Sequence, residues 1–114
     1  MRSMYIGALA IVASTAMVPG HAADDFDRAI TAIEAYDYPR ALPPLREAAS
    51  HGDRRAQRLL GFMLLHGEQL YRGISANPAE AVAWLRKASA QGDEQAGWVV
   101  ARIDRSRVAS TAPR

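Results

Sequence analysis

Two segments of the chain are copies of one another, separated by 40 residues. Most of the shared positions are small or apolar: Ala41, Leu45, Arg46, Ala48, Gly52, Asp53 and Ala56 recur as Ala81, Leu85, Arg86, Ala88, Gly92, Asp93 and Ala96. A fixed period in this range is typical of helical repeat proteins, whose modules bury their apolar faces by stacking on one another. The period therefore predicts an all-α fold, a short α-solenoid of antiparallel helix pairs.

The first 22 residues have the pattern of a secretory signal peptide. A short basic start, Met1-Arg2-Ser3, precedes an apolar stretch from Met4 to Val18, and the segment Pro19-Gly20-His21-Ala22 resembles a cleavage region. The apolar stretch is shorter than the ~20 residues that a membrane-spanning helix requires, which favours cleavage after Ala22 over a retained anchor. We therefore expect a periplasmic or secreted product with no stable membrane insertion.

Cleavage leaves 92 of the 114 residues (114 − 22), enough for one small domain with a single core. The sequence contains no cysteine, so apolar packing between helices must stabilise the fold without disulfides. The formal net charge of +2 falls to +1 when Arg2 is removed, which is too small for binding to a phosphate backbone. Nucleic acid is therefore not an expected partner.

Helical periodicity predicts five helices in the processed chain. The first, from Asp25 to Tyr36, is expected to cap the N-terminal end of the stack. The other four are expected at residues 38–51, 54–66, 78–91 and 94–105. The domain accordingly covers residues 23–105, with the capping helix at 25–36, repeat copies at 37–76 and 77–105, and a flexible tail at 106–114.

Local signals define the helix boundaries and the centre of the core. Gly52-Asp53 and Gly92-Asp93 each combine a helix stop with the N-cap of the next helix, which predicts tight antiparallel pairs. Asn77-Pro78-Ala79-Glu80 has the pattern of a capping box. Pro43-Pro44 predicts a kink in the helix at 38–51. Leu60 is expected at the centre of the core, where Gly61 allows a neighbouring helix to approach closely.

The segments ALPPLREAASHGDRRAQRLLGFMLLHG and AEAVAWLRKASAQGDEQAGWVVARI resemble the Sel-one-like repeat (SLR) family, relatives of tetratricopeptide repeats. The motifs that carry the resemblance are Ala81 and Trp84, the two Gly-Asp turns, and Ala56-Gln57 followed by Leu60-Gly61. Pro44 replaces the tryptophan in the first copy, and the connection from Gly67 to Ile74 is longer than the family's short link. The resemblance implies a tetratricopeptide-like scaffold for protein interaction, without conserved chemistry or cofactors.

No motif in the sequence indicates catalysis, a metal or a cofactor. His51 and His66 each precede a helix-ending glycine, where an imidazole can satisfy the last carbonyl groups of the helix. Metal-ligand spacings, a nucleophile elbow and a phosphate-binding loop are all missing from the sequence. We expect a non-catalytic scaffold that binds an unidentified protein or peptide in the bacterial cell envelope. The alternatives are a dedicated inhibitor or immunity-type partner of a secreted enzyme, and a small envelope hydrolase.

The candidate protein-binding residues are aromatic and arginine side chains, the types that most often anchor interfaces. They are Tyr71 and Arg72 in the long connection, Arg55, Arg58 and Phe62 on the helix before it, and Trp98 on the last helix. Two alternatives stay open: Tyr71 could fold back to close the core, and the C-terminal tail could cover Trp98. Trp84 is interpreted as a core residue because it shares a helix face with Ala81 and Ala88.

Overall fold

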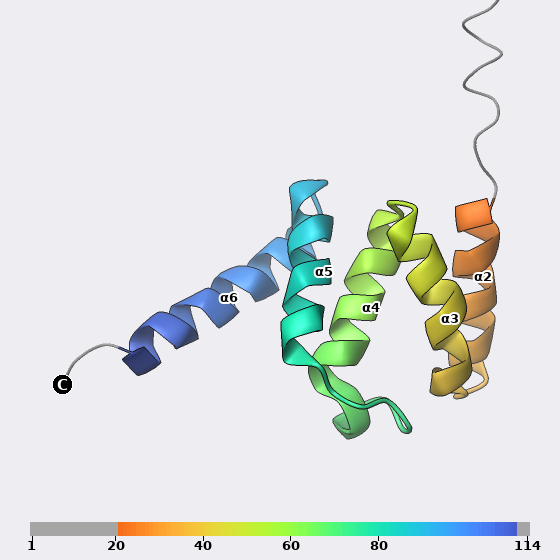
Figure 1. Cartoon of the computed structure of the whole chain (residues 1–114), viewed down its shortest axis with the longest axis horizontal. Coiled ribbons are helices and arrows are strands. Elements are labelled where there is room, and N and C mark those ends of the chain that lie inside the picture. The colour runs from red at the N-terminus through yellow and green to blue at the C-terminus, as the bar shows by residue number, and fades with distance from the viewer. Residues whose placement is uncertain (1–20, 112–114) are drawn as a thin grey trace, which may run out of the picture.

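The computed structural model describes residues 21–111 of the chain. Within this range there are five α-helices and no strand: α2 (His21–Glu34), α3 (Tyr38–Ser50), α4 (Arg54–His66), α5 (Pro78–Ala90) and α6 (Glu94–Thr111). A short 3₁₀-helix, η2 (Gly67–Gln69), follows α4. Each α-helix packs mainly against the helices that precede and follow it in the sequence (Figure 1). The structure therefore confirms an all-α fold of packed helix pairs.

The two Gly-Asp turns have the same geometry, as expected for copies of one module. Gly52 and Gly92 both have φ = 94°, a left-handed conformation that glycine adopts at no steric cost. The amide of Asp53 donates to the carbonyl of Ala48 at 3.1 Å, as that of Asp93 does to Ala88 at 3.1 Å. Each aspartate then caps the following helix by accepting from the amide three residues later, Ala56 at 3.4 Å and Ala96 at 2.9 Å.

The core extends along the stack, with α4 at its centre between α3 and α5. The largest fully buried side chains are Leu45, Leu60, Met63, Ile74 and Leu85. The predicted close approach at Gly61 is confirmed, since a Cβ atom at this position would lie 2.6 Å from Leu85 Cγ and 3.2 Å from the carbonyl oxygen of Ala81. The absence of a side chain at residue 61 therefore sets the separation of α4 and α5.

The N-terminal helix starts earlier and ends earlier than the periodicity predicts. It covers His21–Glu34 rather than 25–36. Tyr36 lies in the turn with φ = 58°, and its amide donates to the carbonyl of Ile33, while that of Asp37 donates to Ala32. These bonds satisfy the last carbonyls of α2 and end the helix. Residues 1–20 of the expected signal peptide lie outside the described residues.

The last helix is longer than expected, and the prediction of a tail from residue 106 is wrong as far as Thr111. No glycine or proline interrupts the sequence between residues 98 and 111, so nothing ends the helix at Arg105. The hydroxyl groups of Ser106, Ser110 and Thr111 bond to carbonyls of the preceding turn, which keeps these polar residues compatible with a helix. Residues 112–114 lie outside the described residues.

The long connection after α4 folds back onto the body of the protein. Ile74 is buried in the core. The Cα of Gly73 lies against Pro39 at the start of α3, so closely that a Cβ would be 2.7 Å from Pro39 Cγ. The amide of Asn77 donates to the carbonyl of Leu64 at 2.8 Å, which ties the end of the connection to α4. None of the helices in residues 21–111 is both long and apolar enough to cross a membrane.

Candidate interaction surface

The structure brings two of the predicted binding residues together. Phe62 on α4 and Trp98 on α6 line a groove of about 400 Å³, together with Leu65, His66, Val99, Arg102, Ile103 and Ser106. The groove continues past Glu94 and Gln95 at the start of α6. Its floor is formed where Phe62, Leu65 and Val99 pack on buried residues of α5 and α6. We call this surface the Phe62–Trp98 groove.

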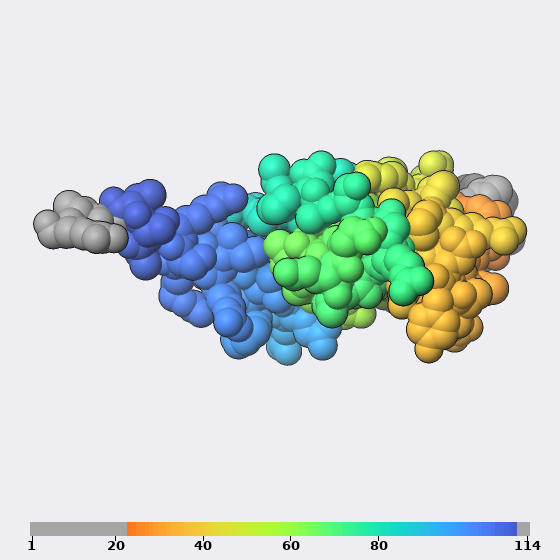
Figure 2. All heavy atoms as spheres, turned by 90° about the horizontal axis from the view of Figure 1, so that it is seen from below, coloured from red at the N-terminus to blue at the C-terminus, as the bar shows by residue number. Residues whose placement is uncertain are grey.

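The groove exists because α4 and α6 both pack on α5 but diverge from each other. Figure 1 shows α6 leaving the stack at an angle, and the view from below in Figure 2 shows its C-terminal part extending beyond the body. The side chain of Trp98 is 64% exposed, and the guanidinium of Arg102 lies 5.8 Å from the centre of its ring. Residues 106–111 continue α6 as a helix, so this part of the expected tail does not fold back over Trp98.

Arg58 and Arg55 are both held in ion pairs rather than free for a partner. The Nη1 atom of Arg58 lies 3.0 Å from Oδ2 of Asp93, which links α4 to the second Gly-Asp turn. Arg55 pairs with Asp53 at 2.8 Å, and its guanidinium also lies 4.2 Å from the ring centre of Phe26. The hydrogen bonds that Arg55 donates to the carboxylate of Asp53 raise the pKa of Arg55. Both arginines therefore join neighbouring parts of the stack.

The side chains of Tyr71 and Arg72 do not line the groove. Tyr71 is half-buried and packs edge to face on Tyr38, with a distance of 5.3 Å between the ring centres. Burial raises the pKa of its phenol, and Tyr38 adds to the effect. Tyr71 thus folds back toward the core, which was the alternative left open by the sequence. Arg72 is exposed next to it.

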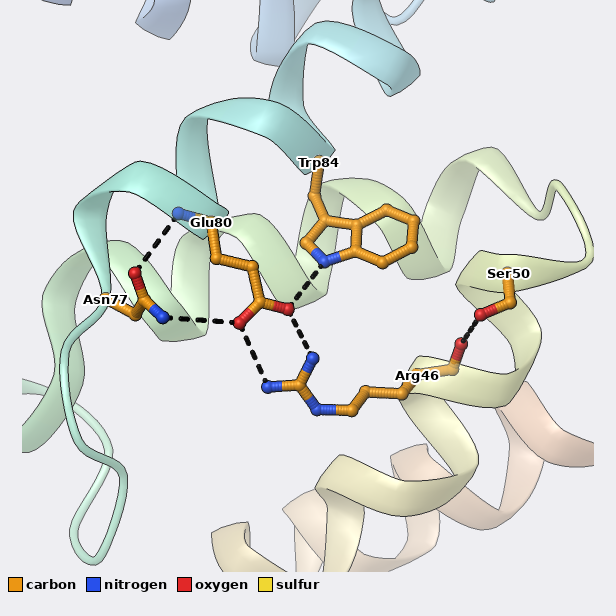
Figure 3. Close-up of polar contacts among 5 residues, drawn as sticks. All are labelled: Arg46, Ser50, Asn77, Glu80 and Trp84. Atoms are coloured by element: carbon orange, nitrogen blue, oxygen red, sulfur yellow. Dashed lines mark hydrogen bonds and ion pairs between the residues drawn. The ribbon is translucent and has the colours of Figure 1, made fainter.

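A polar cluster between α3 and α5 was missed by the sequence analysis (Figure 3). Glu80 accepts from the guanidinium of Arg46 through both carboxylate oxygens, and Trp84 Nε1 donates to it at 3.0 Å. The hydrogen bonds from Arg46 and Trp84 lower the pKa of Glu80, and burial opposes them only in part. The recurrence of Arg46 as Arg86 was the available signal, but the partner of Arg46 lies 34 residues away.

This cluster corrects two details of the sequence analysis. Trp84 is half-buried rather than fully in the core, because its indole N–H must reach Glu80 at the surface. The Asn77 side chain does cap α5, since its Oδ1 accepts from the amide of Glu80 at 3.2 Å. The Glu80 carboxylate, however, binds Arg46 and Trp84, and its contact with the cap is to the Asn77 side chain at 3.4 Å. The capping box is therefore only half formed.

His51 and His66 both lie at helix ends. No group of three or more His, Cys, Asp or Glu side chains that could hold an ion occurs among residues 21–111. His51 follows α3, and its Nδ1 atom lies 2.8 Å from the carbonyl oxygen of Glu47, to which it donates. This agrees with the expected role of an imidazole at a helix end. His66 lines the Phe62–Trp98 groove.

Comparison with protein families identifies the central part of the stack. A family model described as Sel1 repeat matches residues 54–93. This segment is therefore similar to a Sel1 repeat, and we use that name for it. The matched segment comprises α4, the long connection, α5 and the second Gly-Asp turn. No curated protein and no solved structure gives a significant match to the chain.

The Sel1 repeat indicates a helical repeat module for protein interaction. Its two helices meet at Gly61 and Leu85, so this close helix contact lies inside the matched segment. Phe62 belongs to this repeat, whereas Trp98 belongs to α6, which follows it. The Phe62–Trp98 groove therefore lies at the junction of the Sel1 repeat with the last helix of the stack.

Proposed function

We propose that this chain is a non-catalytic, exported scaffold that binds another protein or a peptide in the bacterial cell envelope. A partner docks in the Phe62–Trp98 groove. The observation that carries this proposal is the exposed indole of Trp98 beside an apolar groove at the end of a Sel1 repeat. Tryptophan at the edge of a preformed apolar depression is a frequent anchor of protein interfaces.

The composition of the groove supports a peptide-like partner. Apolar side chains from two helices form its floor, so an aliphatic or aromatic side chain of the partner can be desolvated there. Arg102 lies at one end of the groove and Glu94 at the other. These charges provide polar contacts at the rim, where they orient a partner more than they add affinity.

Export is supported by the pattern of the first 22 residues and remains part of the proposal. Its test is mass spectrometry of the protein recovered from cells that express the full-length chain, combined with fractionation of those cells. The expected result is a chain that begins at Ala23 in the periplasmic or extracellular fraction. An intact N-terminus in the cytoplasmic fraction would overturn the envelope assignment and leave the groove unaffected.

The groove is tested by site-specific photo-crosslinking from position 98 in intact cells, followed by purification of the crosslinked partner. Binding of that partner is then measured with Trp98→Ala and Phe62→Ala. Each variant is expected to weaken binding by about tenfold or more, because interface anchors of this kind contribute ~2 kcal/mol or more. The matched control is Leu70→Ala, which removes a 60% exposed apolar side chain outside the groove. Wild-type affinity in both groove variants would show that the partner docks elsewhere.

A further inference from the structure

The two end helices of the stack each leave one face without a neighbour among the described residues. The main packing partner of α2 is α3, and that of α6 is α5. Figure 1 places α2 and α6 at opposite ends of the row of helices. In a solenoid such end faces are where a further module would stack. Their composition therefore decides what else can bind there.

The outer face of α6 is exposed, partly apolar and basic. Its residues follow helical spacing on the side opposite the buried Ala96 and Val100: Trp98, Ala101, Arg102, Arg105 and Val108. Val108 is 69% exposed. No carboxylate among residues 21–111 forms an ion pair with either Arg102 or Arg105.

The repeat register shows that this face corresponds to a stacking face. Ala101 is the counterpart of Gly61, 40 residues earlier, which receives Leu85 of the next helix. Trp98 is the counterpart of Arg58, which pairs with Asp93 of the second Gly-Asp turn. Both positions therefore contact the next helix or turn of the stack in the first copy, and in the second copy both are exposed.

The outer face of α2 is acidic. Asp24, Asp27, Thr31 and Glu34 are exposed and follow helical spacing on the side opposite the buried Ala29 and Ala32. None of the three carboxylates forms an ion pair within residues 21–111. The free face at one end of the stack thus carries the opposite charge to the free face at the other end.

We propose that the chain associates head to tail, with the outer face of α6 of one copy bound to the outer face of α2 of a second copy. Arg102 and Arg105 then face the carboxylates of Asp24, Asp27 and Glu34, and Ala101 and Val108 lose contact with water. The two faces lie at opposite ends of one molecule, so they cannot contact each other within a single copy. A contact of this kind is heterologous and adds copies in a row.

The test measures the mass in solution of the protein produced from the full-length chain, by analytical ultracentrifugation over a series of concentrations and salt conditions. The expected result is an average mass that rises with protein concentration beyond that of two copies and falls at high salt. The variant Arg102→Glu with Arg105→Glu raises the dissociation constant by about tenfold or more. Asp27→Arg with Glu34→Arg has the same effect.

Mixing these two variants is the decisive measurement, because each supplies the charge that the other lacks. The mixture is expected to associate like the wild type. Arg107→Glu is the control for Arg105→Glu alone, since it makes the same single charge reversal on the side of α6 opposite Arg105 and leaves the mass unchanged. Circular dichroism melting checks that each double variant is folded. An unfolded double variant is replaced by a single one, Arg105→Gln on α6 or Glu34→Gln on α2, which must also weaken association.

Three results would overturn the proposal. One is a wild-type protein that stays a single copy at all concentrations and at low salt. Another is a closed dimer that the α2 substitutions do not weaken, because a symmetric contact would use α6 alone. The last is a mixture of the two charge-reversed pairs that fails to associate while both are folded. Arg102 also lines the Phe62–Trp98 groove, so binding of the groove partner is measured separately with Trp98→Ala and Phe62→Ala and does not enter these outcomes.

Discussion

The backbone of Gly61 in α4 lies directly against the side chain of Leu85 in α5. A Cβ atom at residue 61 would be 2.6 Å from Leu85 Cγ and 2.7 Å from Leu85 Cδ2, closer than side-chain atoms pack in proteins. Both helices belong to the Sel1 repeat. The pair therefore fixes how closely the two helices of the repeat can approach, and with it the position of every helix that packs on them.

We expect Gly61→Ala to lower the free energy of unfolding by about 1 to 3 kcal/mol, because overpacking outweighs the gain in helix propensity. Chemical denaturation measures the change. Gly97→Ala is the matched control within a helix, since the nearest atom there is the Oγ of Ser89, which can rotate away. This control is expected to be neutral or stabilising. A Gly61→Ala variant that is more stable than the wild type would contradict the close approach of the helices.

Leu60→Ala is expected to destabilise the protein by about 2 to 5 kcal/mol, because it leaves a cavity at the fully buried centre of α4. The comparison is Leu70→Ala, which removes the same side chain from an exposed position and is expected to change stability by less than about 0.5 kcal/mol. Thermal melting of both variants provides the measurement. Equal melting temperatures would mean that Leu60 is not part of the core.

Asp93→Ala is expected to be more destabilising than Asp53→Ala, although both aspartates cap a helix. The side chain of Asp93 is 3% exposed and also pairs with Arg58 on α4, whereas Asp53 pairs with Arg55 two residues away. Loss of a cap costs about 1 kcal/mol, and loss of the ion pair to the half-buried Arg58 adds about 1 kcal/mol. Urea denaturation of the two variants distinguishes these cases. A larger loss at Asp53 would argue against a stabilising role of the Asp93–Arg58 ion pair.

The Arg46–Glu80 contact predicts a specific dependence of stability on pH. Hydrogen bonds from Arg46 and Trp84 lower the pKa of Glu80 below its ordinary value of 4.5. The ionised carboxylate therefore stabilises the folded state above that pH. This stabilisation disappears as the pH falls through the lowered pKa. Glu80→Gln is expected to cost about 1 kcal/mol at neutral pH and progressively less below about pH 4.5.

Urea denaturation of the wild type and Glu80→Gln at several pH values tests this dependence. The difference in unfolding free energy between the two proteins should be constant at neutral pH and shrink in acid. Glu47→Gln is the control, because Glu47 lies on the same helix as Arg46 and is exposed. If the difference in unfolding free energy between the wild type and Glu80→Gln does not change with pH, the ionised form of Glu80 does not stabilise the fold.

Local features of the structure were predictable wherever the determinant is a few residues long. The Gly-Asp turns, the Asn77 cap and the start of α4 at Arg54 follow from backbone conformation and N-capping, which neighbouring residues decide. The role of Gly61 could also be predicted, because glycine destabilises the interior of a helix and its presence there indicates a close approach of a neighbouring helix. The end of α6 was mispredicted because no residue before Thr111 forces a helix to stop, and a fading apolar pattern is a weak signal of termination.

The candidate surface could be predicted only in part. Phe62 and Trp98 were identified as residue types that suit an interface, but their meeting in one groove depends on the angle between α4 and α6, which no local pattern encodes. The same limitation applies to Tyr71, whose position against Tyr38 depends on how the long connection folds back. Arg58 was predicted to be available, yet a carboxylate from the next module holds it.

By itself, then, the sequence determined the class of the fold, the period of its modules and the chemistry of their turns, because these depend on contacts over short distances along the chain. Only the tertiary structure decided which side chains remain free: Glu80 holds Arg46, Asp93 holds Arg58, and Trp98 is left exposed at the end of the stack. The physical reason is that ion pairs and solvent exposure depend on the relative placement of whole helices, which is set by packing between residues far apart in the sequence.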